Sequence, residues 1–105
     1  MPSNVLLTPD KETRIITDRA LHKFAYHQHV RYRLLVVNDY YNHQYNFFLE
    51  WHRPAERSRS IPLHSLHNYD LAYLRRVLLL VQTDVGFSVS FRDFARSAIN
   101  LLQKS

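Results

Sequence analysis

Three consecutive segments decide the fold of this chain: RYRLLVVN (residues 31–38), QYNFFLEWHR (residues 44–53) and RSRSIPL (residues 57–63). The middle segment alternates most clearly between apolar and polar side chains. Alternation with a period of two is typical of a β-strand with one buried face. The sequence therefore predicts three strands in a row, with helices before and after them.

In the middle strand, one parity is apolar and the other is mostly polar. The apolar side chains are Tyr45, Phe47, Leu49 and Trp51, and the other parity holds Gln44, Asn46, Phe48, Glu50 and His52. Phe48 is thus an apolar ring on the polar face, where it has no packing role unless another element covers it. The alternative is that the N-terminal helix covers this face and Phe48 belongs to the core.

The neighbouring segments differ in their expected places in the sheet. Leu35 and Val37 make both faces of the first strand apolar, which favours a central position. The connector 39–43 is rich in turn-forming residues and short enough for an antiparallel hairpin. Pro62 cannot donate a backbone hydrogen bond, so the third strand is expected to lie at an edge or to end there.

Two interpretations are open for the N-terminal residues. In the first, residues 5–7 and 14–17 form a small hairpin around a turn at Pro9 and Asp10. In the second, residues 8–28 form one long helix with Thr8 as the N-cap and Pro9 at its first position. The hairpin reading adds a short helix from Arg19 to about His27 that is capped by Asp18 and buries Leu21, Phe24 and Ala25.

Two further helices are expected after the strands. The first begins at Asn68 or Asp70, continues through Gln82 and stops before Gly86, the only glycine of the chain, where a left-handed turn is predicted. The second starts at a capping-box-like pair, Ser90 and Asp93. Its apolar side chains are Phe91, Phe94, Ala95, Ala98, Leu101 and Leu102. Together these elements predict a single α+β domain over residues 1–105, with a small, largely antiparallel sheet of three to five strands and about three helices.

Composition narrows the classes of function. The chain has 105 residues, of which 46% are hydrophobic and 13% aromatic, so a folded core is expected. One glycine is too few for a phosphate-binding loop, a dinucleotide fingerprint or a nucleophile elbow. The absence of cysteine excludes disulfides and thiolate sites, and fits a reducing compartment. No signal peptide or membrane span is predicted, so a cytoplasmic location is expected.

The order of elements over residues 46–103 resembles a small accessory domain that precedes the ATPase module of plasmid and phage replicative helicase-like proteins. The resemblance rests on the Ile61-Pro62 pair, the segment Asp84-Val-Gly-Phe-Ser-Val89 and the apolar residues of the last helix. The chain departs from that pattern by lacking glycine at 54–58, and it has no ATPase module. The resemblance implies an accessory role in replication of a mobile element.

Catalysis and metal binding find little support. Seven histidines are present, and the pairs His27/His29 and His64/His67 have spacings that fit a metal ligand set, with Asp70 one turn further. No thiolate assists, and histidines mixed with tyrosines are typical of an amphipathic surface. Glu50 and His52 also match an ordinary exposed strand face. A non-enzymatic protein without metal or cofactor is therefore expected.

Charge and aromatic content favour nucleic acid as the partner. The formal net charge is +5, and a polyanion is a natural ligand for a basic surface. Single-stranded DNA or RNA is held when bases stack on aromatic rings and cations neutralise phosphates. The predicted stacking residues are Phe48 and Tyr41, and the predicted phosphate contacts are Arg31, Arg33, Arg53, Arg57 and Arg59.

The alternative is a protein-interaction module or inhibitor that binds a larger replication or defence enzyme. Tyrosine, tryptophan and arginine are the residue types enriched in interface hot spots. A homodimer through a sheet edge or the last helix belongs to the same alternative. Composition does not show whether a surface of tyrosine and arginine binds protein or nucleic acid. The salt dependence of the affinity does, because phosphate contacts weaken steeply with salt and an aromatic protein interface responds weakly.

Overall fold

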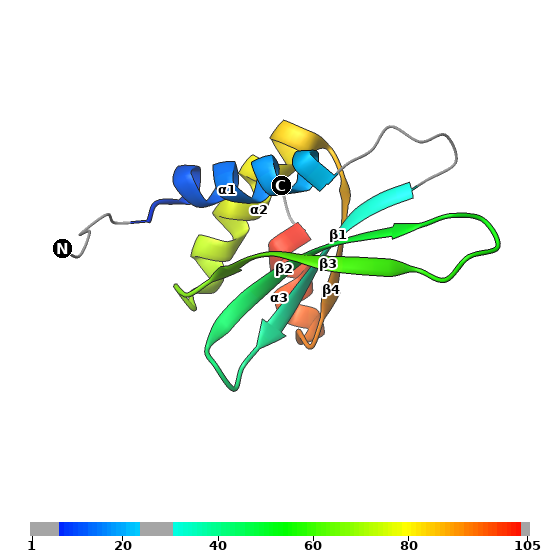
Figure 1. The fold of residues 1–105 in the computed structure, drawn as a ribbon. Coiled ribbons are helices and arrows are strands. Elements are labelled where there is room, and N and C mark those ends of the chain that lie inside the picture. Colours follow the sequence, from blue (N-terminus) through cyan, green and yellow to red (C-terminus); the bar gives the residue numbers. More distant parts are fainter. Residues whose placement is uncertain (1–6, 24–30, 104–105) are drawn as a thin grey trace.

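The computed structural model describes residues 7–23 and 31–103, and the fold is reported for these residues. They form three helices and a four-stranded sheet, an α+β fold as predicted (Figure 1). In chain order the elements are α1 (Pro9–Lys23), β1 (Arg31–Asp39), β2 (Gln44–His52), β3 (Arg59–Leu66), α2 (Leu71–Val85), β4 (Ser88–Arg92) and α3 (Arg96–Gln103).

The sheet is mixed, with the strand order β3-β2-β1-β4. β2 pairs antiparallel with both β1 and β3, whereas β4 lies parallel to β1. The predicted central position of the first strand is confirmed because β1 has a partner on each side. The predicted edge position of the strand with Pro62 is also confirmed, although β3 continues to Leu66 and Pro62 lies within it.

One hydrophobic core joins all three helices to one face of the sheet. The core residues of β1 and of β2 each have a single parity, and β2 contributes Tyr45, Phe47 and Leu49, which are at most 4% exposed. This confirms the predicted core face. In β3 the core holds Leu63 and Leu66, because the pairing with β2 shifts at a bulge between Phe47 and Phe48. Leu35, which is 6% exposed, has the opposite parity and is not part of the core. We call its side of the sheet the open face, because none of the described helices packs on it; Leu35 itself is nevertheless buried there.

A single helix occupies the N-terminal region, so the predicted hairpin is wrong. The hydroxyl oxygen of Thr8 accepts a hydrogen bond from the backbone N–H of Lys11 at 3.2 Å, and Pro9 fills the first helical position. Glu12, Ile16 and Ala20 recur every four residues and are buried. This inward stripe packs against α2 and β3.

The helix predicted to start after Asp18 is wrong for the same reason. Asp18 lies inside α1, with a helical residue on either side. Leu21 was predicted to be buried, but its side chain is 49% exposed, because the inward stripe runs through Ile16 and Ala20. Phe24, Ala25 and His27, the other predicted residues of this helix, lie outside the described residues.

The caps of α2 match the prediction. The Asp70 carboxylate accepts a hydrogen bond from the backbone N–H of Ala72 at 3.2 Å, which makes Asp70 the N-cap. Gly86 has φ 66° and closes the helix by donating its N–H to the Gln82 carbonyl at 2.9 Å. The helix extends to Val85, slightly beyond the predicted end at Gln82.

The start of the last helix was predicted wrongly, because Ser90 and Phe91 belong to strand β4 and α3 begins only at Arg96. In β4, Val89 and Phe91 pack against the core beside β1. Pairing with the free edge of β1 therefore outweighs the local capping-box pattern. Within residues 7–23 and 31–103, no helix is both long and apolar enough to cross a membrane.

Candidate nucleic-acid interface

The candidate interface is the arm formed by the ends of β2 and β3 that project beyond the helices (Figure 1). The register places Trp51 opposite Arg59 on β3 and His52 opposite Arg31 on β1. The connecting turn is closed by a hydrogen bond from the Glu56 N–H to the Arg53 carbonyl at 3.1 Å. Residues 51–59 therefore come together at one end of the sheet, and we call this region the arm.

Three exposed arginines dominate the charge of the arm: Arg53, Arg57 and Arg59. Glu56 is the acidic residue between them, and its carboxylate lies 4.0 Å from Arg53 Nε, with both side chains about half exposed. An ion pair this open to solvent contributes about 0–1 kcal/mol. In the described part of the chain, Arg57 and Arg59 have no carboxylate within 4.0 Å. Their charges are available to an anionic ligand.

Trp51 lies among these arginines. It is half-buried and lines a pocket of about 230 Å³ together with Arg53, Glu56, Arg57 and Arg59. Its ring centroid is 6.4 Å from that of Tyr32, which in turn stacks on Phe87 at 6.2 Å. Aromatic packing thus supports one side of the indole. An aromatic ring surrounded by arginines has the chemistry to stack a base and to neutralise the adjoining phosphates.

Sequence reasoning assigned Trp51 to the core face and missed its role in this arrangement. The parity is correct, since Trp51 packs partly against the core. However, the strand extends past the helices at this point, so the indole also borders the arm. A signal was present in the sequence: the only tryptophan stands within eight residues of three arginines.

Arg33 and Arg31 are weaker candidates for phosphate contacts than the three arginines of the arm. Arg33 lies on the open face directly opposite Glu50, and its Nε is 2.9 Å from the Glu50 carboxylate. Its charge is therefore largely offset within the protein. Arg31 begins β1 at the base of the arm, but its side chain is outside what the structure describes.

Phe48 lies on the open face, as its parity predicts. Its cross-strand neighbours are Leu35 on β1 and Pro62 on β3, so three apolar side chains form a strip across the middle of the sheet. The ring is half-buried by this strip. The alternative that the N-terminal helix covers this face does not hold for the described part, since α1 packs against α2 and β3 on the core side.

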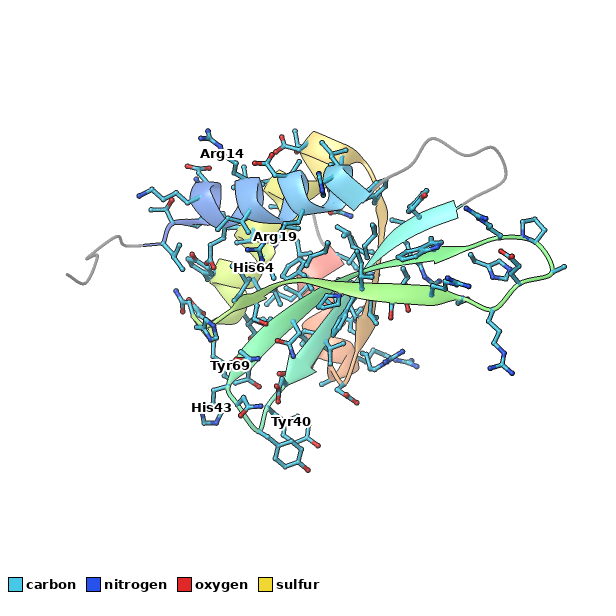
Figure 2. The ribbon with its side chains drawn as sticks, viewed as in Figure 1. Arg14, Arg19, Tyr40, His43, His64 and Tyr69 are labelled. Atoms are coloured by element: carbon cyan, nitrogen blue, oxygen red, sulfur yellow. The ribbon has the colours of Figure 1, made fainter. Side chains whose placement is uncertain are left out.

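Tyr41 lies at the opposite end of the sheet from the arm. It is 83% exposed in the β1–β2 turn, where its ring centroid lies 4.5 Å from that of Tyr40. Figure 2 shows Tyr40 at the tip of this hairpin. β2 separates this turn from the arm, a length of about 26 Å at 3.3 Å per residue. The structure thus brings Arg53, Arg57 and Arg59 together and leaves Phe48 and Tyr41 at two separate places.

A second group of polar side chains lies inside the molecule, between α1, β3 and α2. Glu12 is 1% exposed, and its carboxylate is 2.9 Å from the Nε2 of His64 (Figure 2). The Tyr73 hydroxyl donates a hydrogen bond to the other carboxylate oxygen. We call these three residues the interlayer cluster. Each belongs to a different element, so its hydrogen bonds fasten α1 to both β3 and α2.

Of the predicted metal-ligand pair His64 and His67, His64 belongs to the interlayer cluster and contacts Glu12. Among the described residues, no three histidine, aspartate or glutamate side chains lie close enough together to hold a metal ion. His27 and His29 lie outside the described residues. Glu50 pairs with Arg33, and His52 Nδ1 is 3.5 Å from the Ser58 hydroxyl, so both have partners on the strand surface.

Alkaline pH is expected to weaken the interlayer cluster. Burial, followed by the hydrogen bond to Glu12, raises the pKa of Tyr73 above its ordinary value of 10.0. Above pH 10 the unfolded state therefore loses a proton that the folded state keeps, and stability falls as the pH rises. The stability that Tyr73 contributes is fully present below pH 10. We expect the difference in unfolding free energy between the wild type and Tyr73→Phe to shrink from pH 9 to pH 11.

Urea denaturation at a series of pH values measures this difference. Tyr40 and Tyr45 also have raised pKa values, but they are present in both proteins and cancel in the comparison. A difference that stays constant up to pH 11 would contradict the prediction.

Three comparisons with known proteins found nothing: no family model, no curated protein and no solved structure matches the chain.

Proposed function

We propose that this protein binds single-stranded nucleic acid through its arm and does so without catalysing a reaction. Trp51 stacks on a base, and Arg53, Arg57 and Arg59 contact the flanking phosphates. The observation that carries the proposal is the placement of three exposed arginines around the half-buried indole at the free end of a sheet. Phe48 and Tyr41 lie outside this arrangement, so their stacking role stays a prediction.

A single strand fits the arm better than a duplex does. Stacking on Trp51 requires a base whose face is free, and bases in a duplex are already stacked on their neighbours. The ion pair between Arg53 and Glu56 is weak, so a phosphate can replace Glu56 beside Arg53 at little cost in free energy. The interaction is expected to be tolerant of sequence, because every base has a face that stacks.

The tip of the β1–β2 hairpin favours a second candidate function, binding of a protein. Tyr40 and Tyr41 are 52% and 83% exposed, and such rings are common anchors in protein interfaces. A partner bound there would leave the arm free. An accessory role beside a larger replication enzyme, as the resemblance over residues 46–103 implies, would use the two ends of the sheet together.

The first test is a titration of labelled single-stranded DNA and RNA, followed by fluorescence anisotropy at about 50 and 200 mM salt. Three phosphate contacts predict a slope of about −2 in a plot of log affinity against log salt, which corresponds to a roughly 20-fold loss over this range. Because the chain has one tryptophan, its emission reports directly on Trp51. We expect oligonucleotides to quench it.

Polyphosphate provides the matched control, because it carries the charge without the bases. It is expected to compete for the arm without the quenching that base stacking causes. Binding of DNA that leaves Trp51 emission unchanged would place the interface elsewhere on the molecule. No binding at either salt concentration would contradict the proposal and favour a protein partner at the tyrosine-rich tip.

A further inference from the structure

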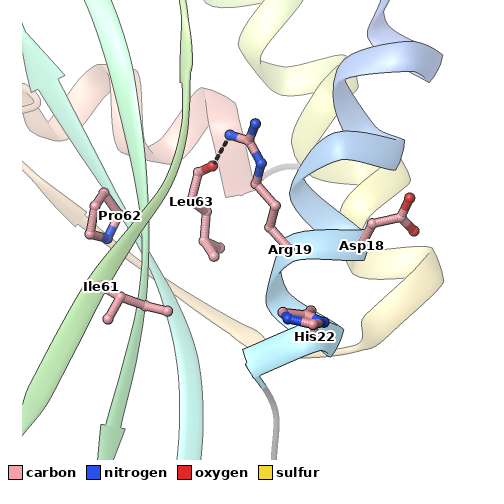
Figure 3. A pocket seen from close by; sticks show the side chains of 6 residues that line it. All are labelled: Asp18, Arg19, His22, Ile61, Pro62 and Leu63. Carbon is pink, nitrogen blue, oxygen red and sulfur yellow. Dashed lines mark hydrogen bonds between the residues drawn. The ribbon is translucent and has the colours of Figure 1, made fainter.

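A groove of about 490 Å³ lies between helix α1 and edge strand β3 (Figure 3). Small-molecule sites commonly have volumes of about 300–1,000 Å³. The helix contributes Asp18, Arg19 and His22, and the strand contributes Ile61, Pro62 and Leu63. None of these residues takes part in the proposed nucleic-acid site.

The strand side of the groove is entirely apolar. Leu63 is 3% exposed and joins the core, Ile61 is half-buried beside it, and Pro62 is exposed at the edge. Because Pro62 has no N–H, this part of the edge lacks a donor that an added peptide strand would need. The groove therefore suits a small apolar molecule better than an extended peptide.

The helix side supplies a positioned cation. Arg19 donates a hydrogen bond from Nη1 to the Leu63 carbonyl at 2.6 Å, which holds its guanidinium beside Leu63 (Figure 3). A guanidinium has five N–H donors, so most of them remain for a ligand. No described carboxylate lies within 4.0 Å of Arg19. The neighbouring Asp18 points away from the strand (Figure 3).

From this geometry we infer that the groove binds a small molecule with an apolar body and a carboxylate, of the kind that a medium-chain fatty acid represents. The apolar body rests on Ile61 and Leu63, and Pro62 borders the groove at the edge of the strand. The carboxylate accepts hydrogen bonds from the free N–H groups of Arg19, a pairing in which both groups are charged and the planar geometries match. His22, one turn along α1, borders the same end of the groove.

The test is an NMR titration of the ¹⁵N-labelled full chain with decanoate, and with decanol as a neutral ligand of matched length, both below their aggregation concentrations. We expect saturable shifts of the backbone amides of Arg19, His22, Ile61 and Leu63. Decanoate is expected to bind about tenfold more tightly than decanol, the ratio that one charge-assisted hydrogen bond supports. Arg19→Gln should abolish this preference, whereas Arg76→Gln on the exposed side of α2 should retain it.

Three results would overturn the inference: no saturable shift, equal affinities for decanoate and decanol, or shifts centred on Leu35 and Phe48 of the open face. If Arg19→Gln fails to fold, the comparison of the two ligands on the wild-type protein still decides the matter. The nucleic-acid proposal is tested separately, because its readout is Trp51 emission and its residues are not shared with the groove.

Discussion

Replacement of Arg53, Arg57 and Arg59 together by glutamine is expected to weaken binding of single-stranded DNA about 100-fold at ~0.1 M salt. Each phosphate contact on a single strand contributes about 0.7 to the slope of log affinity against log salt. Between 1 M and 0.1 M salt, three phosphate contacts therefore change the affinity by about two orders of magnitude. The slope of log affinity against log salt should become less steep, changing from about −2 towards zero. Anisotropy titrations at several salt concentrations measure both quantities.

The matched control removes the same charge elsewhere. Arg14, Arg76 and Arg96 are exposed on α1, α2 and α3, away from the arm. Their combined replacement by glutamine lowers the net charge equally, but exposed charges beyond about 10 Å are largely screened at 0.1 M salt. We expect a loss of less than about threefold. Equal losses in the two triple variants would show that binding follows net charge and not the arm.

Glu12→Ala is expected to give the largest loss of stability among substitutions on α1, about 3 kcal/mol in the free energy of unfolding. Glu12 is 1% exposed and accepts from Tyr73 while its other oxygen lies 2.9 Å from His64 Nε2. Alanine leaves both partners facing a cavity without the carboxylate that satisfied them. Urea denaturation at pH 7, with circular dichroism as the signal, measures the loss.

Asp18→Ala is the control for this substitution, because Asp18 is exposed on the same helix. Its cost is expected within about 0.5 kcal/mol, which is usual for surface positions. Glu12→Gln keeps the shape of the side chain and one of the two acceptor oxygens, so it should cost less than Glu12→Ala. A loss for Glu12→Ala that is no larger than the loss for Asp18→Ala would mean that the interlayer cluster does not hold α1 in place.

Local chemistry explains which predicted elements were correct. The alternation in residues 44–52 defines a face without reference to any other segment, and the side chains of Phe47 and Leu49 are indeed buried. The ends of α2 follow from single residues, since Asp70 satisfies N–H groups at one end and Gly86 adopts a left-handed conformation at the other. Pro62 marks an edge strand because it lacks a donor.

The elements predicted wrongly depend on partners distant in the chain. Glu12 can be buried in α1 because His64 and Tyr73 satisfy its carboxylate. These partners lie 52 and 61 residues away in the sequence. Ser90 and Phe91 become a strand because β1 offers them a free edge, about 55 residues earlier in the sequence. No local pattern contains these pairings. The turn residues Pro9 and Asp10 therefore favoured a hairpin, although Thr8 and Pro9 also fitted the observed helix, and the pair Ser90 and Asp93 favoured a helix start where β4 forms.

The candidate site divides in the same way. The sequence by itself determined the α+β class, the two faces of β2 and the presence of three arginines near the only tryptophan. The tertiary structure alone decided which of these residues meet. The β2–β3 hairpin extends beyond the helices at Trp51, so the indole borders Arg57 and Arg59. The sheet also sets Glu50 opposite Arg33, so this arginine is paired. Burial and pairing are properties of neighbours in space, and neighbours are fixed only when the sheet and helices have packed.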